Sequence, residues 1–155
     1  YMNAADVLWL LFDMILLVLF GSTLSSIISF PLTTQGQLSA VGTIVSAGYG
    51  FLCGAYMPIS NFGPGLQKAL SYLPSTYATS LIKNHMLHGV FREMERKHYS
   101  GEMVDVIKRT LDCNPVFHGN VVSVNQMIGI MMGSIAVFGI IYYIVTLLSK
   151  GEGGR

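Results

Sequence analysis

The stretch GAYMPISNFGPGLQKALSYLPSTYATSLIKNHMLHGVF, residues 54–91, decides the fold of this chain. It is largely apolar, yet Pro58, Pro64 and Pro74 interrupt it, as do several glycines. Backbone groups that such breaks set free inside a bilayer must be satisfied by protein or by water. Broken segments at membrane depth are typical of transport pathways. The stretch therefore predicts more than a plain membrane anchor.

Charge is scarce in this chain and unevenly distributed. Of the 155 residues, 52% are hydrophobic and 11% are charged, whereas a soluble domain carries roughly 25% charged residues. Residues 83–112 hold six of the nine Lys and Arg and five of the eight Asp and Glu. The nearly uncharged remainder predicts a multi-pass protein of the cell membrane. The net charge of +1 gives no support for nucleic-acid binding.

Three apolar runs are long enough to cross a bilayer, which takes about 20 residues. They cover residues 7–30, 38–57 and 121–149. Residues 58–120 lie between the second and third runs and contain the broken and the charged parts. The pattern predicts an all-α polytopic membrane protein with about three spanning helices. It also predicts a re-entrant helical hairpin and a short external amphipathic helix.

Within residues 58–120 we expect three short helices. Pro64 suits the first turn of a helix over 65–73, where its missing N–H is not needed. Ser75 is expected to cap an amphipathic helix over 76–88, and a polar, charged stretch follows it. Residues 102–111 predict the external helix, with acids near its start and bases near its end, as the helix dipole favours.

Small residues recur every four positions in the second apolar run, at Gly42, Ser46, Gly50 and Gly54. On a helix they share one face and allow a neighbouring backbone to approach closely. Gly129 and Gly133 form a similar pair in the third run, although such pairs are also common by chance. These six positions are our predicted helix-packing residues.

Asp13 is the only charge in the first apolar run, and Asp6 precedes it by seven residues on the same helical stripe. Ionisable residues inside a membrane helix usually face a bundle interior or a water-filled cavity. Two interpretations stay open: Asp13 bonds to a neighbouring helix, or it belongs to a translocation pathway.

Other reactive residues predict no catalytic or metal site. His85 and His88 share a helix face, but no HExxH pattern is present, so a role at a helix interface is the better interpretation. Cys53 and Cys113 are widely separated and predict free thiols. No P-loop or nucleophile motif occurs, so by itself the chain is expected to be no enzyme and to hold no cofactor.

The segments GAYMPIS, residues 54–60, and SYLPSTYA, residues 71–78, resemble the membrane domains of type-two ABC exporters. In that family a spanning helix ends in a glycine and then a proline. A re-entrant hairpin and a leucine-proline, two-residue, tyrosine-alanine element follow. The matching positions here are Gly54, Pro58, Pro74, Tyr77 and Ala78. The resemblance covers residues 7–149 as the fourth to sixth spanning helices, so residues 1–155 would form the C-terminal half of such a domain.

This resemblance implies a permease subunit in the translocation pathway of an ATP-driven exporter. ATP would bind to a separate cassette subunit or domain. A second permease half or copy, and membrane lipids, would be the other partners. Pro58, Pro64, Pro74 and Tyr77 would belong to an extracellular gate hairpin.

The family pattern also implies sidedness: residues 33–37 and the C-terminus would be cytoplasmic and the charged loop external. A simple count of Lys and Arg favours the opposite orientation. We follow the family pattern, because the loop also carries five acids and contains structured helices. A start at Tyr1 suggests a piece of a longer protein.

One alternative of a different class is a non-transporting membrane sensor or assembly subunit. Its charged loop would bind an extracytoplasmic partner. A Walker A sequence in an adjacent gene or domain, together with an upstream membrane half, would favour the exporter.

Overall fold

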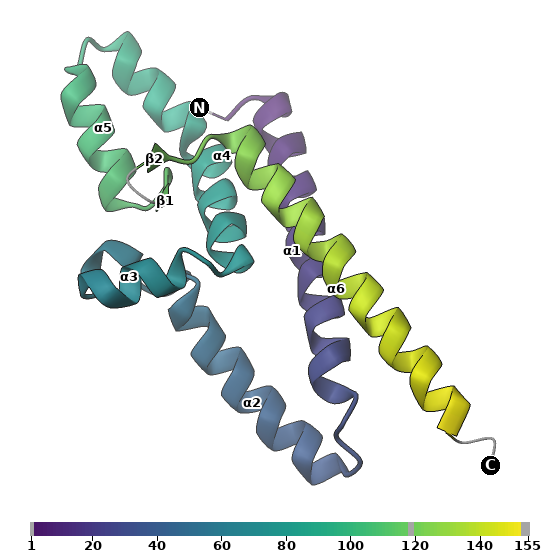
Figure 1. The fold of residues 1–155 in the computed structure, drawn as a ribbon. Coiled ribbons are helices and arrows are strands. Elements are labelled where there is room, and N and C mark those ends of the chain that lie inside the picture. The colour runs from purple at the N-terminus through teal and green to yellow at the C-terminus, as the bar shows by residue number, and fades with distance from the viewer. Residues whose placement is uncertain (1, 118–119, 153–155) are drawn as a thin grey trace.

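The computed structural model describes residues 2–117 and 120–152, and these form an all-helical fold with one minimal β-hairpin. Figure 1 shows α1, α2 and α6 as long helices that extend toward one end of the molecule, with α3 lying across them. The elements are α1 (Ala4–Ser29), α2 (Gln35–Leu52), the 3₁₀ turn η1 (Ile59–Asn61), α3 (Pro64–Leu70), α4 (Pro74–Arg96), α5 (Gly101–Thr110), β1 (Val116–Phe117), β2 (Asn120–Val121) and α6 (Val124–Glu152).

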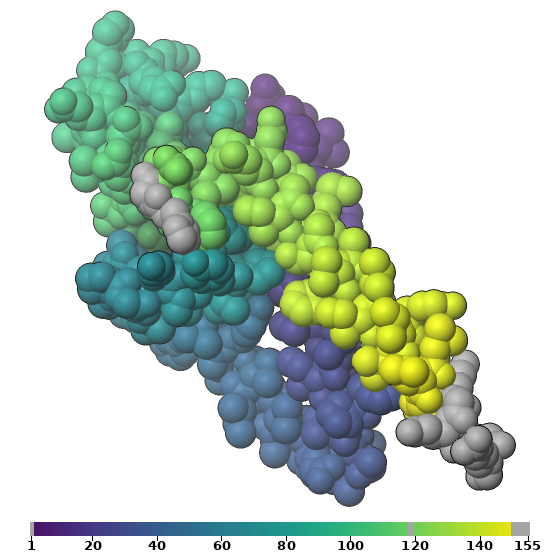
Figure 2. Space-filling model, viewed as in Figure 1, coloured from purple at the N-terminus to yellow at the C-terminus, as the bar shows by residue number. Residues whose placement is uncertain are grey.

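Two described helices are long and apolar enough to cross a membrane: α1 and the Val124–Ser149 part of α6. Large apolar side chains remain exposed on both, for example Val18 at 65% and Leu148 at 68%. Such exposed apolar surfaces are compatible with contact with lipid. In Figure 2 α6 forms an exposed ridge along one side of the molecule.

The expected count of three spanning helices is not confirmed. The second apolar run forms α2, which has 18 residues and ends at Leu52, five residues before the predicted end of that span. It is not among the two described helices that meet the length and apolarity test for a membrane span. At roughly 1.5 Å per residue, α2 reaches about 27 Å, slightly less than the roughly 30 Å hydrocarbon core.

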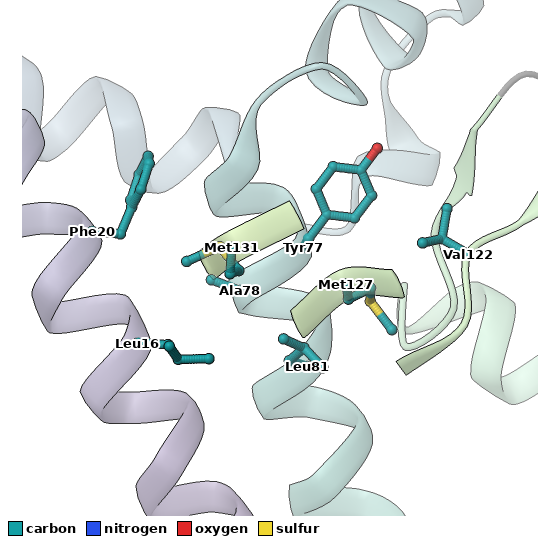
Figure 3. Close-up of a cluster of buried hydrophobic side chains, with 8 residues drawn as sticks. All are labelled: Leu16, Phe20, Tyr77, Ala78, Leu81, Val122, Met127 and Met131. Carbon is teal, nitrogen blue, oxygen red and sulfur yellow. The ribbon is translucent and has the colours of Figure 1, made fainter. Parts of the chain in front are cut away.

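The core lies where α4 is inserted between α1 and α6. Figure 3 shows Tyr77, Ala78 and Leu81 of α4 beside residues of the two apolar helices. The buried cluster consists of Leu16, Phe20, Tyr77, Ala78, Leu81, Val122, Met127 and Met131. Because Tyr77 and Ala78 meet Leu16 and Phe20, α4 begins near the middle of α1 rather than at its end (Figure 1).

The structure corrects the prediction for residues 76–101. Ser75 is not the N-cap, because Leu73 takes that position and Pro74 is the first helical residue of α4. The helix also does not stop at Gly89, which is buried within it, but runs on to Arg96. Glycine disfavours a helix interior by only about 1 kcal/mol, so the packing of its neighbours outweighs that preference.

The short amphipathic helix predicted over residues 102–111 is present as α5. The Ser100 hydroxyl caps it by accepting a hydrogen bond from the Met103 N–H at 3.4 Å. Its apolar side packs under the C-terminal half of α4, in a second cluster of Phe91, Val104 and Cys113. Pairing of Val116 with Val121 and of Phe117 with Asn120 then leads the chain into α6.

The two ends of the bundle differ. Figure 1 shows the start of α1, the end of α4 and all of α5 at one end. The turn between α1 and α2 and the C-terminal end of α6 lie at the other. Residues 33–37 and the end of α6 therefore lie at the same end of the bundle, as the order of the apolar runs predicts.

Candidate functional site at the α1–α4 interface

Two Asp–His pairs join α1 to α4. The Nδ1 atom of His85 lies 2.5 Å from Oδ2 of Asp13, and Nδ1 of His88 lies 2.8 Å from Oδ1 of Asp6. Seven residues are close to two helical turns, so both carboxylates face the same way. The two histidines, three apart on α4, present their rings to the same side. Both histidines thus lie at the interface between α1 and α4.

The two pairs differ in exposure, so we call Asp13–His85 the inner pair and Asp6–His88 the outer pair. The Asp13 and His85 side chains are 1% and 13% exposed, whereas the His88 side chain is 52% exposed. The outer pair has an additional cation, because Nη2 of Arg92 lies 3.4 Å from Oδ2 of Asp6. The inner pair is therefore an enclosed ion-pair site and the outer pair an open one.

The inner pair is incompletely bonded. An ionised carboxylate only accepts hydrogen bonds, so Nδ1 of His85 carries the hydrogen that Oδ2 of Asp13 accepts. The other oxygen, Oδ1, is buried and has no hydrogen-bond partner in the described part of the chain. Trp9 stacks on the His85 ring, with centroids 5.7 Å apart and planes at 19°. Of the two interpretations of Asp13, bonding to a neighbouring helix is what the structure shows; a pathway role stays a prediction.

The two histidines do not share a metal-binding position, since each contacts a different aspartate. Among the described residues no group of three or more His, Cys, Asp or Glu side chains is arranged to hold a metal ion. The chemistry available at this interface is proton binding and ion pairing.

Beyond α2 the chain bends sharply at Gly54, which has a φ of +77°. The Ala55 N–H donates to the Gly50 carbonyl at 3.1 Å and the Gly54 N–H to the Phe51 carbonyl at 3.3 Å. This is the Schellman arrangement, in which a glycine in the left-handed conformation ends a helix. Gly54 therefore terminates α2, as the resemblance implies, and does not lie on the packing face that the four-residue spacing predicts.

Three side chains hold the segment after Gly54 in place. Nζ of Lys83, on α4, donates to the Gly54 carbonyl at 2.9 Å. The carboxylate of Asp112, just after α5, accepts a hydrogen bond from the Ile59 N–H. Nε2 of Gln67 donates to the Phe62 carbonyl at 2.7 Å. The bend is thus fastened to α4 and to the end of α5, two contacts that no local pattern indicates.

The gate residues predicted from the resemblance all lie at helix starts. Pro58 precedes η1, while Pro64 and Pro74 are at the starts of α3 and α4. Tyr77 is 3% exposed and donates from its hydroxyl to the Ser71 carbonyl at 2.5 Å. The prolines therefore mark a compact connection from α2 to α4. The Tyr77 hydroxyl bonds back to Ser71 in the last turn of this connection.

The predicted packing residues of α2 line a cavity instead of a close helix contact. Gly42, Ser46 and Gly50 face α1 across a cavity of about 490 Å³. A Cβ added at Gly42 would meet no atom within 4 Å, and the same holds for Gly129 and Gly133 on α6. At Gly50 a Cβ would lie 2.5 Å from the Tyr56 ring, which belongs to the bend. Within the described residues, no close helix packing occurs at Gly42, Gly129 or Gly133.

Cys53 and Cys113 are free thiols, as predicted, and both are buried. Burial raises the pKa of the Cys113 thiol, which lies beneath α4 and α5 outside the spanning helices. A raised thiol pKa lowers the thiolate fraction that reacts with alkylating reagents.

We therefore expect Cys113 to resist alkylation in the folded protein. A cysteine introduced by Val106→Cys, at an α5 position that is 62% exposed, should label at least about tenfold faster. Maleimide labelling at neutral pH, followed by mass spectrometry, measures both rates. Equal rates would mean that α5 does not cover Cys113. Labelling of the Val106→Cys variant from outside intact cells also tests the external side proposed for the loop.

Comparisons with protein-family models, with curated proteins and with solved structures found no match to this chain.

Proposed function

We propose that this chain is a permease subunit and forms part of the translocation pathway of an ATP-driven exporter. The observation that carries the proposal is the position of α4. This helix is too polar to qualify as a spanning helix, yet it begins near the middle of α1 and packs between two apolar helices. A connection of η1, α3 and tight turns precedes it. Non-helical backbone at membrane depth is tolerated where protein or a water-filled path surrounds it.

The remaining parts of the proposal follow from the resemblance to type-two ABC exporters. A cassette subunit or domain would supply ATP hydrolysis, and a second permease half or copy would complete the pathway. The connection from Pro58 to Pro74, with Tyr77, would act as the outer gate. The contacts of Lys83 and Asp112 support this role, because they couple the connection to α4 and α5, so that it can move only together with them.

The proposal is tested by purifying the tagged full chain from its native membranes in mild detergent after brief chemical cross-linking. We expect a protein with an ATP-binding cassette to copurify, together with vanadate-sensitive ATP hydrolysis. An unrelated tagged membrane protein from the same host is the control. Recovery without any ATP-binding protein would contradict the exporter proposal. Recovery of an extracytoplasmic protein bound to the 89–120 region would favour the sensor or assembly alternative.

A further inference from the structure

Among the described residues, the ionisable groups that pair across the α1–α4 interface belong to these two helices. Asp6 and Asp13 lie on α1, and His85, His88 and Arg92 lie on α4. The other helices around α4 add no charge to these pairs. α6 has no Asp, Glu, Lys, Arg or His from Val124 to Ser149, and α2 has none of them from Gln35 to Leu52. On α5, Lys108 lies over the Phe91 ring, at 5.2 Å from its centroid, in the second cluster.

The charge balance of the outer pair differs from that of the inner pair. Arg92 is always protonated, so Asp6 faces a cation whether His88 is charged or neutral. Asp13 is bonded to His85, and within the described residues its second oxygen is buried and unbonded. While Asp13 is ionised, the inner pair is therefore neutral only when His85 carries two ring protons. Loss of one proton leaves a buried carboxylate with a single hydrogen bond, which is costly in a low-dielectric interior.

We propose that the Asp13–His85 pair is a proton-binding site, and that the bound proton keeps α4 docked between α1 and α6. The proton is the one on Nε2 of His85, which leaves to water, while the Nδ1 hydrogen stays on the bond to Asp13. One proton is released for each site that opens. The proposal concerns the docking of α4 and holds whether or not the chain exports a substrate.

The direction of the pH effect follows from this balance. The attraction is complete while His85 is protonated, and it is lost as rising pH removes that proton. Histidine is the side chain that ordinarily changes charge near neutral pH. Alkaline conditions therefore release α4, and mildly acidic conditions keep it docked. The outer pair does not impose this dependence, because Arg92 compensates Asp6 at every pH in that range.

The experiment uses the full chain in membranes with Cys53 and Cys113 replaced by alanine. A reporter cysteine is introduced by Ala78→Cys, at a position that is 1% exposed. Met86→Cys, at a position that is 52% exposed on the same helix, corrects for the higher reactivity of every thiol at high pH. Alkylation of the two is compared from about pH 5 to about pH 9. We expect the ratio of buried to exposed labelling to rise on the order of tenfold across this range.

Four variants in the reporter background make the test specific. Asp13→Asn removes the buried charge, so labelling of the reporter cysteine should stay low at every pH. The double variant Asp13→Asn with His85→Gln should show the same low labelling. His85→Gln leaves Asp13 without a cation and should label more than the parent at neutral and alkaline pH. His88→Gln is the matched control and should keep the parental dependence. A pH dependence that persists in Asp13→Asn, or that disappears in His88→Gln, would overturn the proposal.

Discussion

We expect the Ala78→Leu variant to melt about 3–10 °C below the parent protein, because inserting methylenes into a packed core costs roughly 1–3 kcal/mol. Ala78 is 1% exposed and lies where α4 meets both apolar helices. A leucine there has no space unless α1 and α6 move apart. That movement would also loosen the neighbouring contacts of Leu81 and Phe20, which are 0% and 1% exposed.

The measurement is thermal unfolding of the detergent-solubilised protein. Ala69→Leu is the matched control, because it makes the same chemical change at an exposed position of α3. The control should melt within a degree or two of the parent. If Ala78→Leu also melts within a degree or two of the parent, α4 is not tightly packed between the two helices, and the core assignment is wrong.

The second large effect is expected for Gly54→Leu. The φ of +77° at Gly54 is a conformation that costs a residue with a side chain about 1–2 kcal/mol. A Cβ there would also lie 3.0 Å from Cγ1 of Ile59, which the Asp112 carboxylate holds through its N–H. The substitution should therefore open the bend and weaken the contacts of Lys83 and Asp112, while leaving membrane insertion intact.

Two further variants distinguish the effect of the backbone conformation at Gly54 from the effect of side-chain size. Gly63→Leu introduces the same side chain at a negative φ and with no atom within 4 Å of its Cβ, so it should be nearly neutral. Gly54→Asn should lie between the two, since asparagine tolerates the left-handed region better than leucine. Melting temperature and recovery of the cassette protein are the readouts. Equal behaviour of Gly54→Leu and Gly63→Leu would remove the conformational argument.

Several features of the site were predictable from local pattern. The seven-residue spacing of Asp6 and Asp13, and the shared face of His85 and His88, follow from helix geometry alone. The capping of α5 and the breaks at the prolines are likewise properties of short segments. The interruption at Gly54 was also evident, and the resemblance implied a helix end there, although the four-residue spacing had placed Gly54 on a packing face.

Other features were not predictable, because they depend on residues far apart in the chain. His85 meets Asp13 across 72 positions, and His88 meets Asp6 across 82. The bond from Ile59 to Asp112 spans 53. Spacing indicated that such groups face one way, but not which partner each would meet.

By itself the sequence determined that this chain is helical, rich in apolar segments and broken between residues 54 and 74, because hydrophobic run length, proline and glycine act locally. Only the tertiary structure decided that α4 continues through Gly89 and enters the core beside α1. That insertion depends on the packing of Tyr77, Ala78 and Leu81 against both apolar helices. It also brings His85 to Asp13, where a buried carboxylate requires a cation. The broken stretch 54–91 thus places the enclosed ion pair at the α1–α4 interface.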